Sequence, residues 1–388
     1  MTKILFTLGS TGNSDYLNYF PTFELVRGIS ESGQDVHLLV TDNAEFPETA
    51  KQEESGKWLR KVKHDYRTSF GFSHNMAAYL RENDDYDIYH TNGLRTHLNH
   101  LTCVTARRKN RPYLITPYGM LRDYMPGNRR GLASKLYHRV FFSHDIRNAT
   151  CLRAINFEEG KQMRDMGLEN PIACIPWPNY IPPYLDEAVA IGQNWKKEHP
   201  DNRRVASVIT DVDFKSLELL IDAFEAVAEP GSELLLIDFG YVSSTARIKE
   251  FLKEHNPANV RIVENNSDFD NTALLASCCS TVIPANHIFM GAVLARSLLC
   301  LTPVICVYDP STENVPAIDC GWWCMQDKMA FERMISASLL MDYDVLDQKG
   351  QNGRKQVKET YSTEVVVKQM VRVYHWLLGM ESKPDYVI

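Results

Sequence analysis

The segment Gly9-Ser10-Thr11-Gly12-Asn13 contains residue types that can bind a phosphate or a sugar. It directly follows the apolar run Ile4–Leu8 and precedes a helical pattern. Glycines in such a turn let backbone N–H groups approach an anion at the N-terminus of a helix. Paired glycines also occur in many strand-to-helix turns for steric reasons alone. Gly9, Gly12 and Asn13 are therefore candidate ligand-binding residues that need support from other motifs.

Three histidines, His90, His97 and His100, lie close enough in sequence to suggest a metal site. They lack a carboxylate or cysteine at a useful spacing, so we expect no metal there and favour a structural or sugar-contacting role for His90. Asp211 and Asp213 form an acidic pair of the kind that holds a metal. Such short pairs arise readily by chance and do not establish a site.

Length and composition favour a globular protein of two domains. The chain has 388 residues, 44% of them hydrophobic and 23% charged, which is too long for one ordinary core and too apolar for disorder. The net charge of -7 excludes a general nucleic-acid binder. Nine cysteines without a Cys-x-x-Cys pair favour the reducing cytoplasm. The sequence has no run of eighteen apolar residues, so we expect no segment that spans a bilayer.

Basic side chains are concentrated between residues 101 and 150, a segment that contains ten lysines and arginines but only two aspartates. A solvated basic face explains this as well as a functional surface does. The functional alternative is a patch over residues 107–139 that contacts anionic lipid or a lipid-phosphate acceptor, since each cation near such a surface adds about 1 kcal/mol.

Apolar strands alternate with helical patterns along the chain, which predicts an α/β protein with parallel sheets covered on both faces. The four prolines between Pro176 and Pro183 interrupt the pattern and predict a semi-rigid linker. We expect domains at residues 1–180 and 181–362, followed by a helix and tail at 363–388. The expected strands are Ile4–Leu8, Val36–Val40, Tyr86–His90, Tyr113–Thr116, Ala149–Ala154, Ile172–Ile175, Val205–Ile209, Glu233–Asp238, Val260–Val263, Thr281–Pro284 and Val304–Tyr308.

Residues 351–357 (QNGRKQV) and then Tyr361-Ser362 precede an amphipathic helical pattern at residues 363–378. This region resembles the C-terminal end of the family 4 glycosyltransferases, in which an nGR-x-x-V-x-x-x-[FY]-S segment leads into a last helix. The resemblance implies the GT-B fold: two Rossmann-like domains with a cleft between them and a last helix that crosses back to the first domain. We expect Gly350 and Gly353 at helix-stop and turn positions.

Two segments of the first half are similar to acceptor-side motifs of the family. Residues 87–94 (DIYHTNGL) resemble D-[IV]-[IV]-H-x-H-G-L, with Asn92 in place of the second histidine. Residues 116–121 (TPYGML) resemble [ST]-P-H-G-M-L, with Tyr118 in place of a histidine that faces the transferred sugar. The resemblance implies that His90, Asn92 and Tyr118 bind the acceptor and that Tyr118 is also catalytic.

The second half resembles the donor-binding motifs, with several changes. In the family motif a lysine and an arginine about five positions earlier bind the donor pyrophosphate. Lys215 is at the position of that lysine, whereas Thr210 is at the position of the arginine. Ile288 and Arg296 replace the two glutamates of the E-x7-E element, and a shift of one residue would place His287 near the sugar. We expect Lys215 and His287 to be catalytic. The predicted donor-binding residues are Gly9, Gly12, Asn13, Lys215, His287, Gly291, Arg296 and Glu313.

The resemblance implies a glycosyltransferase, of hexosyl or related type, that moves a sugar from a nucleotide-sugar donor to a surface glycan or lipid-linked acceptor with retention of configuration. The changed donor positions also fit a catalytically silent GT-B protein that binds glycan or pairs with an active transferase. A third alternative is a GT-B-like epimerase or another sugar-nucleotide enzyme.

We expect no cofactor and no metal, with the nucleotide-sugar as co-substrate. The expected location is the cytoplasm, peripheral at the inner face of the membrane through residues 107–139. The donor nucleotide, the sugar, the acceptor and the oligomeric state stay open.

Overall fold

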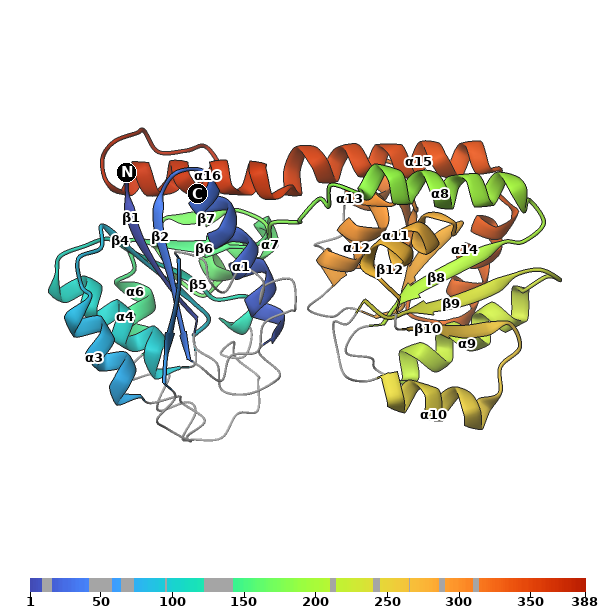
Figure 1. Cartoon of the computed structure of the whole chain (residues 1–388), viewed down its shortest axis with the longest axis horizontal. Helices are drawn as coiled ribbons and strands as arrows, with labels where there is room; N and C mark the ends of the chain where they lie inside the picture. The colour runs from blue at the N-terminus through green and yellow to red at the C-terminus, as the bar shows by residue number, and fades with distance from the viewer. Residues whose placement is uncertain are drawn as a thin grey trace. The chain divides into compact units, whose positions relative to one another are not determined.

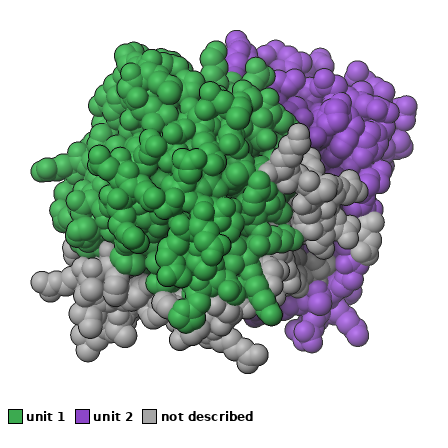
Figure 2. Space-filling view, turned by 60° about the vertical axis from the view of Figure 1, so that its left-hand side comes forward, with its two compact units in different colours: residues 1–178, 363–388 green, residues 179–362 purple. Residues whose placement is uncertain are grey.

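The computed structural model of the chain describes residues 1–8, 16–41, 58–63, 73–94, 96–121, 142–209, 214–239, 245–264, 266–285, 290–309 and 314–388. The chain forms two compact units, which Figure 2 shows in different colours. Unit 1 contains residues 1–178 and 363–388, and unit 2 contains residues 179–362. Both ends of the chain therefore belong to unit 1 (Figure 1).

Unit 1 is built on a parallel sheet with the strand order β3-β2-β1-β4-β5-β6-β7. The strands are β1 (Lys3–Leu8), β2 (Asp35–Thr41), β3 (Leu59–Val62), β4 (Ile88–Asn92), β5 (Tyr113–Thr116), β6 (Cys151–Ala154) and β7 (Ile172–Cys174). The helices are α1 (Tyr16–Glu31), α3 (His74–Glu82), α4 (His97–Arg108), α6 (Ser143–Arg147), α7 (Phe157–Asp165) and α16 (Thr363–Leu377).

Both faces of the unit 1 sheet are covered by helices, so the side chains of β1 point alternately into two cores. Ile4 and Phe6 pack in the core that α1 and α16 cover, while Leu5 packs in the core beneath α3 and α4. Figure 1 shows α16 beside α1. A Cβ atom on Gly28 of α1 would lie 2.6 Å from Val367 of α16, so the two helices require a glycine at their contact. This confirms that the last helix packs on the first domain.

Unit 2 has a second parallel sheet with the strand order β10-β9-β8-β11-β12-β13. Its strands are β8 (Arg204–Val208), β9 (Glu233–Ile237), β10 (Val260–Val263), β11 (Ser280–Ile283), β12 (Val304–Val307) and β13 (Gly321–Cys324). Its helices are α8 (Leu185–Glu198), α9 (Phe214–Val227), α10 (Thr245–His255), α11 (Asp268–Ala276), α12 (Met290–Leu299), α13 (Asn314–Ala317), α14 (Lys328–Leu340), α15 (Tyr343–Gln356) and the π-helical turn η5 (Val357–Tyr361).

Each sheet has one place where the strand order reverses. In unit 1 the chain builds outward through β1, β2 and β3 and then returns to place β4 on the other side of β1. In unit 2 the same reversal lies between β8 and β11. Ligands of open α/β sheets bind at the carboxyl ends of the strands beside such a reversal. The α/β fold class with two Rossmann-like domains is confirmed.

The sequence suggested that Gly350 and Gly353 lie at helix-stop and turn positions, but both lie inside α15. A Cβ atom on Gly350 would lie 2.2 Å from the carbonyl oxygen of Leu301, and one on Gly353 would lie 2.4 Å from a methyl carbon of Leu298. These glycines let α15 approach α12 and the turn after it closely.

The nine cysteines are all free, and eight are buried among apolar side chains. Within the described part of the chain, no helix is long and apolar enough to cross a membrane.

Candidate functional site

Tyr118 and Asn92 lie at the carboxyl edge of the unit 1 sheet, beside the strand-order reversal. Asn92 ends β4, and Tyr118 follows β5 by two residues. The Tyr118 hydroxyl donates to the side-chain oxygen of Asn92 at 2.9 Å and also lies 2.6 Å from the Thr22 hydroxyl of α1. Two of the predicted acceptor-binding residues are thus brought into direct contact.

The backbone of this turn is unusual. Tyr118 has a φ of +51°, a left-handed conformation that tyrosine rarely adopts, and Gly119 follows with a φ of +74°. The Tyr118 ring is buried and packs edge-on against Trp177, with ring centroids 5.6 Å apart. Burial raises the pKa of Tyr118, while the positive charge of Arg153 and the hydrogen bond with Thr22 lower it. The hydroxyl is therefore protonated at neutral pH and can donate a hydrogen bond.

Polar side chains of α4 form hydrogen bonds with the end of β4. The amide nitrogen of Asn99 donates to the Thr91 hydroxyl at 2.6 Å and to the Asn92 carbonyl at 2.9 Å. Thr96 and Asn99 also form a capping box at the start of α4. Hydrogen bonds therefore hold both the backbone carbonyl and the side chain of Asn92.

His90 is fully buried, and both of its ring nitrogens have hydrogen-bond partners. Nδ1 lies 2.7 Å from the Tyr374 hydroxyl of α16, and Nε2 lies 2.7 Å from the Thr116 hydroxyl of β5. Burial, aided by the charge of Arg153, lowers the pKa of His90 well below its ordinary value, so the ring is neutral. His90 thus links α16 to the sheet through hydrogen bonds. Neither ring nitrogen is available to an acceptor substrate, in contrast to the predicted acceptor-binding role of His90.

Two buried charged side chains near Tyr118, Glu159 and Arg153, were not anticipated from the sequence. Glu159 of α7 accepts the backbone N–H of Gly119 at 2.6 Å and that of Ile155 at 2.8 Å. Arg153 of β6 is only 1% exposed and donates to the carbonyl oxygens of Ile175 and Pro176, at 3.2 and 2.6 Å. The sequence did contain a signal for this group, namely an arginine inside an apolar strand. A buried cation in that position must form its hydrogen bonds with other buried groups of the protein.

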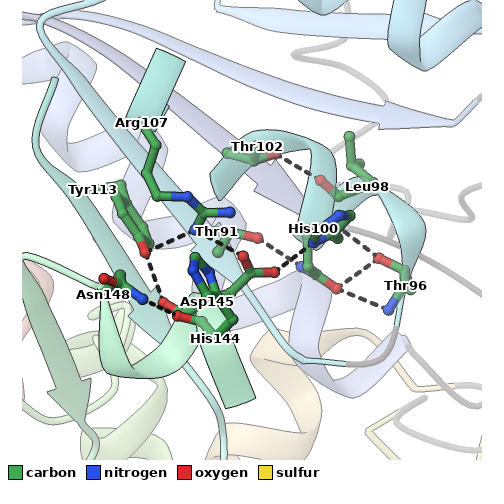
Figure 3. Close-up of polar contacts among 11 residues, drawn as sticks. Thr91, Thr96, Leu98, His100, Thr102, Arg107, Tyr113, His144, Asp145 and Asn148 are labelled. Carbon is green, nitrogen blue, oxygen red and sulfur yellow. Dashed lines mark hydrogen bonds and ion pairs between the residues drawn. The ribbon is translucent and has the colours of Figure 1, made fainter. Parts of the chain in front are cut away.

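His100, Asp145 and Arg107 form a second polar group, on α4 and α6 (Figure 3). The nearly inaccessible Asp145 carboxylate lies 2.7 Å from His100 Nδ1 and 2.7 Å from an Arg107 nitrogen. The sequence showed no carboxylate near the histidines, because Asp145 comes from a distant helix. Among the described residues, no group of three or more histidine, cysteine or acidic side chains could hold a metal ion.

In unit 2, Lys215 and Gly291 lie at helix N-termini on either side of the strand-order reversal. Lys215 is the second residue of α9, which follows β8, and it is exposed. Gly291 is the second residue of α12, which follows β11. Among the described residues, no atom outside its chain neighbours and its own helix backbone lies within 4 Å of the position a Cβ would take. A lysine and two helix N-termini at one edge form a place that favours a phosphate group.

Arg296 has a partner that the sequence did not reveal. Its guanidinium donates to the carboxylate of Asp268, the first residue of α11, and the Tyr184 hydroxyl donates to the other oxygen of the same carboxylate. Arg296 also lies over the ring of Phe239, at 5.1 Å from the centroid. No sequence signal pointed to Asp268 or Tyr184, since neither lies in a recognisable motif.

The remaining predicted site residues, Gly9, Gly12, Asn13, His287 and Glu313, lie outside the described residues, as do Thr210 and Ile288. Their roles stay predictions.

Comparison with known proteins gives a family match over part of the chain and a fold for the whole of it. Residues 22–178 match the model of Glycosyltransferase Family 4, whereas no curated protein sequence matches the chain. The sucrose-phosphate synthase of Thermosynechococcus elongatus is 18% identical with a TM-score of 0.74, and the match covers 98% of this chain and all of that one. A glycosyltransferase from Rickettsia africae is 14% identical with a TM-score of 0.72, over 98% of this chain and 99% of that one.

A third similar structure is Anabaena HepE, solved in complex with UDP and glucose. It is 14% identical with a TM-score of 0.68, and the match covers 96% of this chain and 99% of HepE. Identities this low establish the fold and nothing finer. Residues 22–178 are therefore similar to Glycosyltransferase Family 4, and the chain has the GT-B fold of the sugar transferases that it matches.

Proposed function

We propose that the protein transfers a sugar from a nucleotide-sugar donor to a surface glycan or lipid-linked acceptor, with retention of anomeric configuration. The observation that carries this proposal is the place of the described candidate residues. Asn92 and Tyr118 lie at the reversal of the unit 1 sheet, and Lys215 and Gly291 lie at the reversal of the unit 2 sheet. Binding residues of open parallel sheets are expected at these positions.

The donor side has the charge that the reaction needs. When the bond to the sugar breaks, negative charge grows on the leaving nucleoside diphosphate, and fixed cations or helix N-termini stabilise it. Lys215 would supply the cation, and the N-terminus of α12 at Gly291 would supply backbone N–H groups. The complexes of HepE with UDP and with UDP-glucose support a donor of this class.

The acceptor side would be built around Tyr118. Its protonated hydroxyl is held by Asn92 and Thr22, so its direction is determined before any substrate arrives. Because its one proton is donated to Asn92, the hydroxyl can only accept a hydrogen bond from a sugar hydroxyl. It also cannot exchange protons near neutral pH as the imidazole in the family motif can. His287, Gly9, Gly12, Asn13, Arg296 and Glu313 remain proposed donor-binding residues.

The first experiment is a thermal-shift screen of the purified protein against UDP-, GDP-, ADP-, CMP- and dTDP-sugars. A saturable rise in melting temperature with one nucleotide supports a working donor site and identifies the base. A folded protein that responds to none of them contradicts the proposal.

The second candidate function is a catalytically silent partner of an active transferase. One observation favours it: Arg296 occupies a position where the resemblance predicts a glutamate, and it pairs with Asp268. This alternative predicts that no donor is consumed, even when one binds. A measurement of nucleoside diphosphate release separates the two functions.

The proposed membrane patch contains cations that are already paired. Arg107 contacts Asp145, Lys109 contacts Asp84 at 2.5 Å, and Arg111 lies 3.6 Å from a carboxylate. These contacts offset much of the charge of the described part of residues 107–139. We retain anionic lipid as a proposed partner, and vesicles with and without anionic lipid, compared at two salt concentrations, test it.

A further inference from the structure

The turn formed by Tyr118 and Gly119 has a backbone conformation that needs support from other parts of the protein. Tyr118 has a φ of +51°, a region that residues other than glycine enter rarely and at a cost in free energy. Such a conformation persists only where the surrounding structure holds it. The turn's own hydrogen bond, from the Met120 N–H to the Pro117 carbonyl, does not involve the peptide group between Tyr118 and Gly119.

Glu159 of α7 supplies support at this peptide group. One of its carboxylate oxygens accepts the N–H of Gly119 at 2.6 Å, and the other accepts the N–H of Ile155 at 2.8 Å. The direction of the Gly119 N–H depends on the backbone dihedral angles of Tyr118, because the peptide group between them is planar. The hydrogen bond to Glu159 therefore stabilises the left-handed conformation of Tyr118.

Glu159 is itself held in place. It is only 6% exposed, and its backbone N–H donates at 2.7 Å to the side chain of Asn156, which caps α7. A Cβ atom on the next residue, Gly160, would lie 2.9 Å from the sulfur of Cys174, so α7 lies close against β7. The Glu159 carboxylate thus joins the turn after β5 to the end of β6 from a fixed position.

We propose that Glu159 is a positioning residue for the acceptor side of the site. By holding the backbone of the turn, Glu159 directs the Tyr118 hydroxyl to Asn92 and the Tyr118 ring to Trp177. Without this carboxylate the backbone of Tyr118 can relax to a right-handed conformation, which moves both the hydroxyl and the ring. The inference rests on the proposed sugar transfer, in which Tyr118 contacts the acceptor.

The test compares Glu159→Gln with a matched control, Glu158→Gln. Glutamine keeps the size of the side chain but has one oxygen, so at position 159 its amide nitrogen must face one of the two N–H groups. Both glutamates lie in the first turn of α7, so both changes remove the same favourable charge from the helix N-terminus. Glu158 contacts Gln162 on the same helix, at 3.4 Å.

The first measurement needs no activity. The full chain is labelled with fluorotryptophan, and among its six tryptophans the fluorine resonance of Trp177 is identified by its loss in Trp177→Phe. The Tyr118 ring packs edge-on against Trp177 with centroids 5.6 Å apart, so this resonance reports where the ring lies. We expect the Trp177 resonance to move in Glu159→Gln and to stay in place in Glu158→Gln.

The second measurement separates positioning from a loss of folded protein. In initial-rate kinetics of sugar transfer, Glu159→Gln should raise the KM for the acceptor at least about tenfold, since a small displacement of a contacting group is costly. The KM for the donor should change by less than about twofold, because the proposed pyrophosphate-binding Lys215 lies in unit 2. A loss of folded protein would lower the apparent kcat alone. Glu159→Asp keeps the charge on a shorter side chain and should recover part of the acceptor affinity.

A folded Glu159→Gln with the Trp177 resonance in its wild-type place, or with equal changes in both KM values, overturns the inference and leaves the proposed function intact. If Glu159→Gln does not fold, Glu159→Asp decides by the same two measurements. If the wild-type protein transfers no sugar, the proposed function fails, while the Trp177 resonance still decides whether Glu159 holds the turn.

Discussion

The hydroxyl of Tyr118 donates a hydrogen bond to the side-chain oxygen of Asn92, across the ends of two adjacent strands of the unit 1 sheet. Both residues differ from the histidines that the family motifs carry at these positions. The two replacements therefore contact each other. A tyrosine hydroxyl and an amide oxygen keep a directed polar contact at this edge without a group that titrates near neutral pH.

Tyr118→Phe should destabilise unit 1 by about 1–3 kcal/mol, because it leaves the buried Asn92 oxygen and Thr22 hydroxyl without their partner. Urea unfolding measures the loss. A loss of less than about 0.5 kcal/mol, which is usual for substitutions at exposed positions, would contradict the role assigned to the Tyr118 hydroxyl.

Lys215→Ala should lower kcat/KM about 10²–10³-fold if Lys215 stabilises the leaving diphosphate, which corresponds to about 3–4 kcal/mol. The measurement is initial-rate kinetics with the donor found by the screen. Lys253→Ala, at an exposed lysine in the last turn of α10, is the control and should leave the rate unchanged. Unaltered turnover in Lys215→Ala rules out this role.

The buried neutral His90 should make stability depend on pH. Burial depresses its pKa in the folded state, so the unfolded chain binds the extra proton as the pH falls below about 6.5. The stabilisation is complete above that value and decreases below it, by up to about 1.4 kcal/mol per pH unit. Unfolding curves between pH 5 and pH 8 measure the slope.

His90→Gln should remove this part of the slope, whereas His255→Gln, at an exposed histidine, should retain it. The same slope in wild type and His90→Gln would show that His90 is not the group responsible.

Gly350→Ala should destabilise unit 2 by about 1–3 kcal/mol or more, since its Cβ would overlap the carbonyl oxygen of Leu301 and α15 would have to shift. Gly291→Ala is the matched comparison within a helix. The space around Gly291 is open, so alanine should stabilise α12 by about 0.5–1 kcal/mol. Melting temperatures of the two variants should move in opposite directions, and a shift in the same direction contradicts the packing described here.

The sheets could be predicted from the sequence because their buried strands are short apolar runs with clear ends. The first expected strand, Ile4–Leu8, differs by one residue from β1, and Val260–Val263 coincides with β10. Strand β3 was missed because Leu59–Val62 is short, polar at its centre and only partly buried. Helix α8 was missed because the proline-rich segment before it obscured its start.

The contacts of the candidate site could not be predicted, because they join residues far apart in the chain. Arg296 and Asp268 are 28 residues apart, and His90 and Tyr374 are 284 residues apart. A motif specifies which residue types follow one another, whereas these pairs depend on how helices pack after the sheet has formed. The sequence could therefore suggest that position 296 binds a ligand but not that it binds Asp268.

The most direct test of the central claim is sugar transfer itself. Each donor that binds is incubated with the wild-type protein and a glycan or lipid-linked acceptor fraction, with Lys215→Ala alongside. Sugar incorporation and nucleoside diphosphate release are measured together. The account predicts that the two increase in equal amounts in the wild type and fall steeply in Lys215→Ala. Donor binding without incorporation or release would contradict it and favour the silent partner.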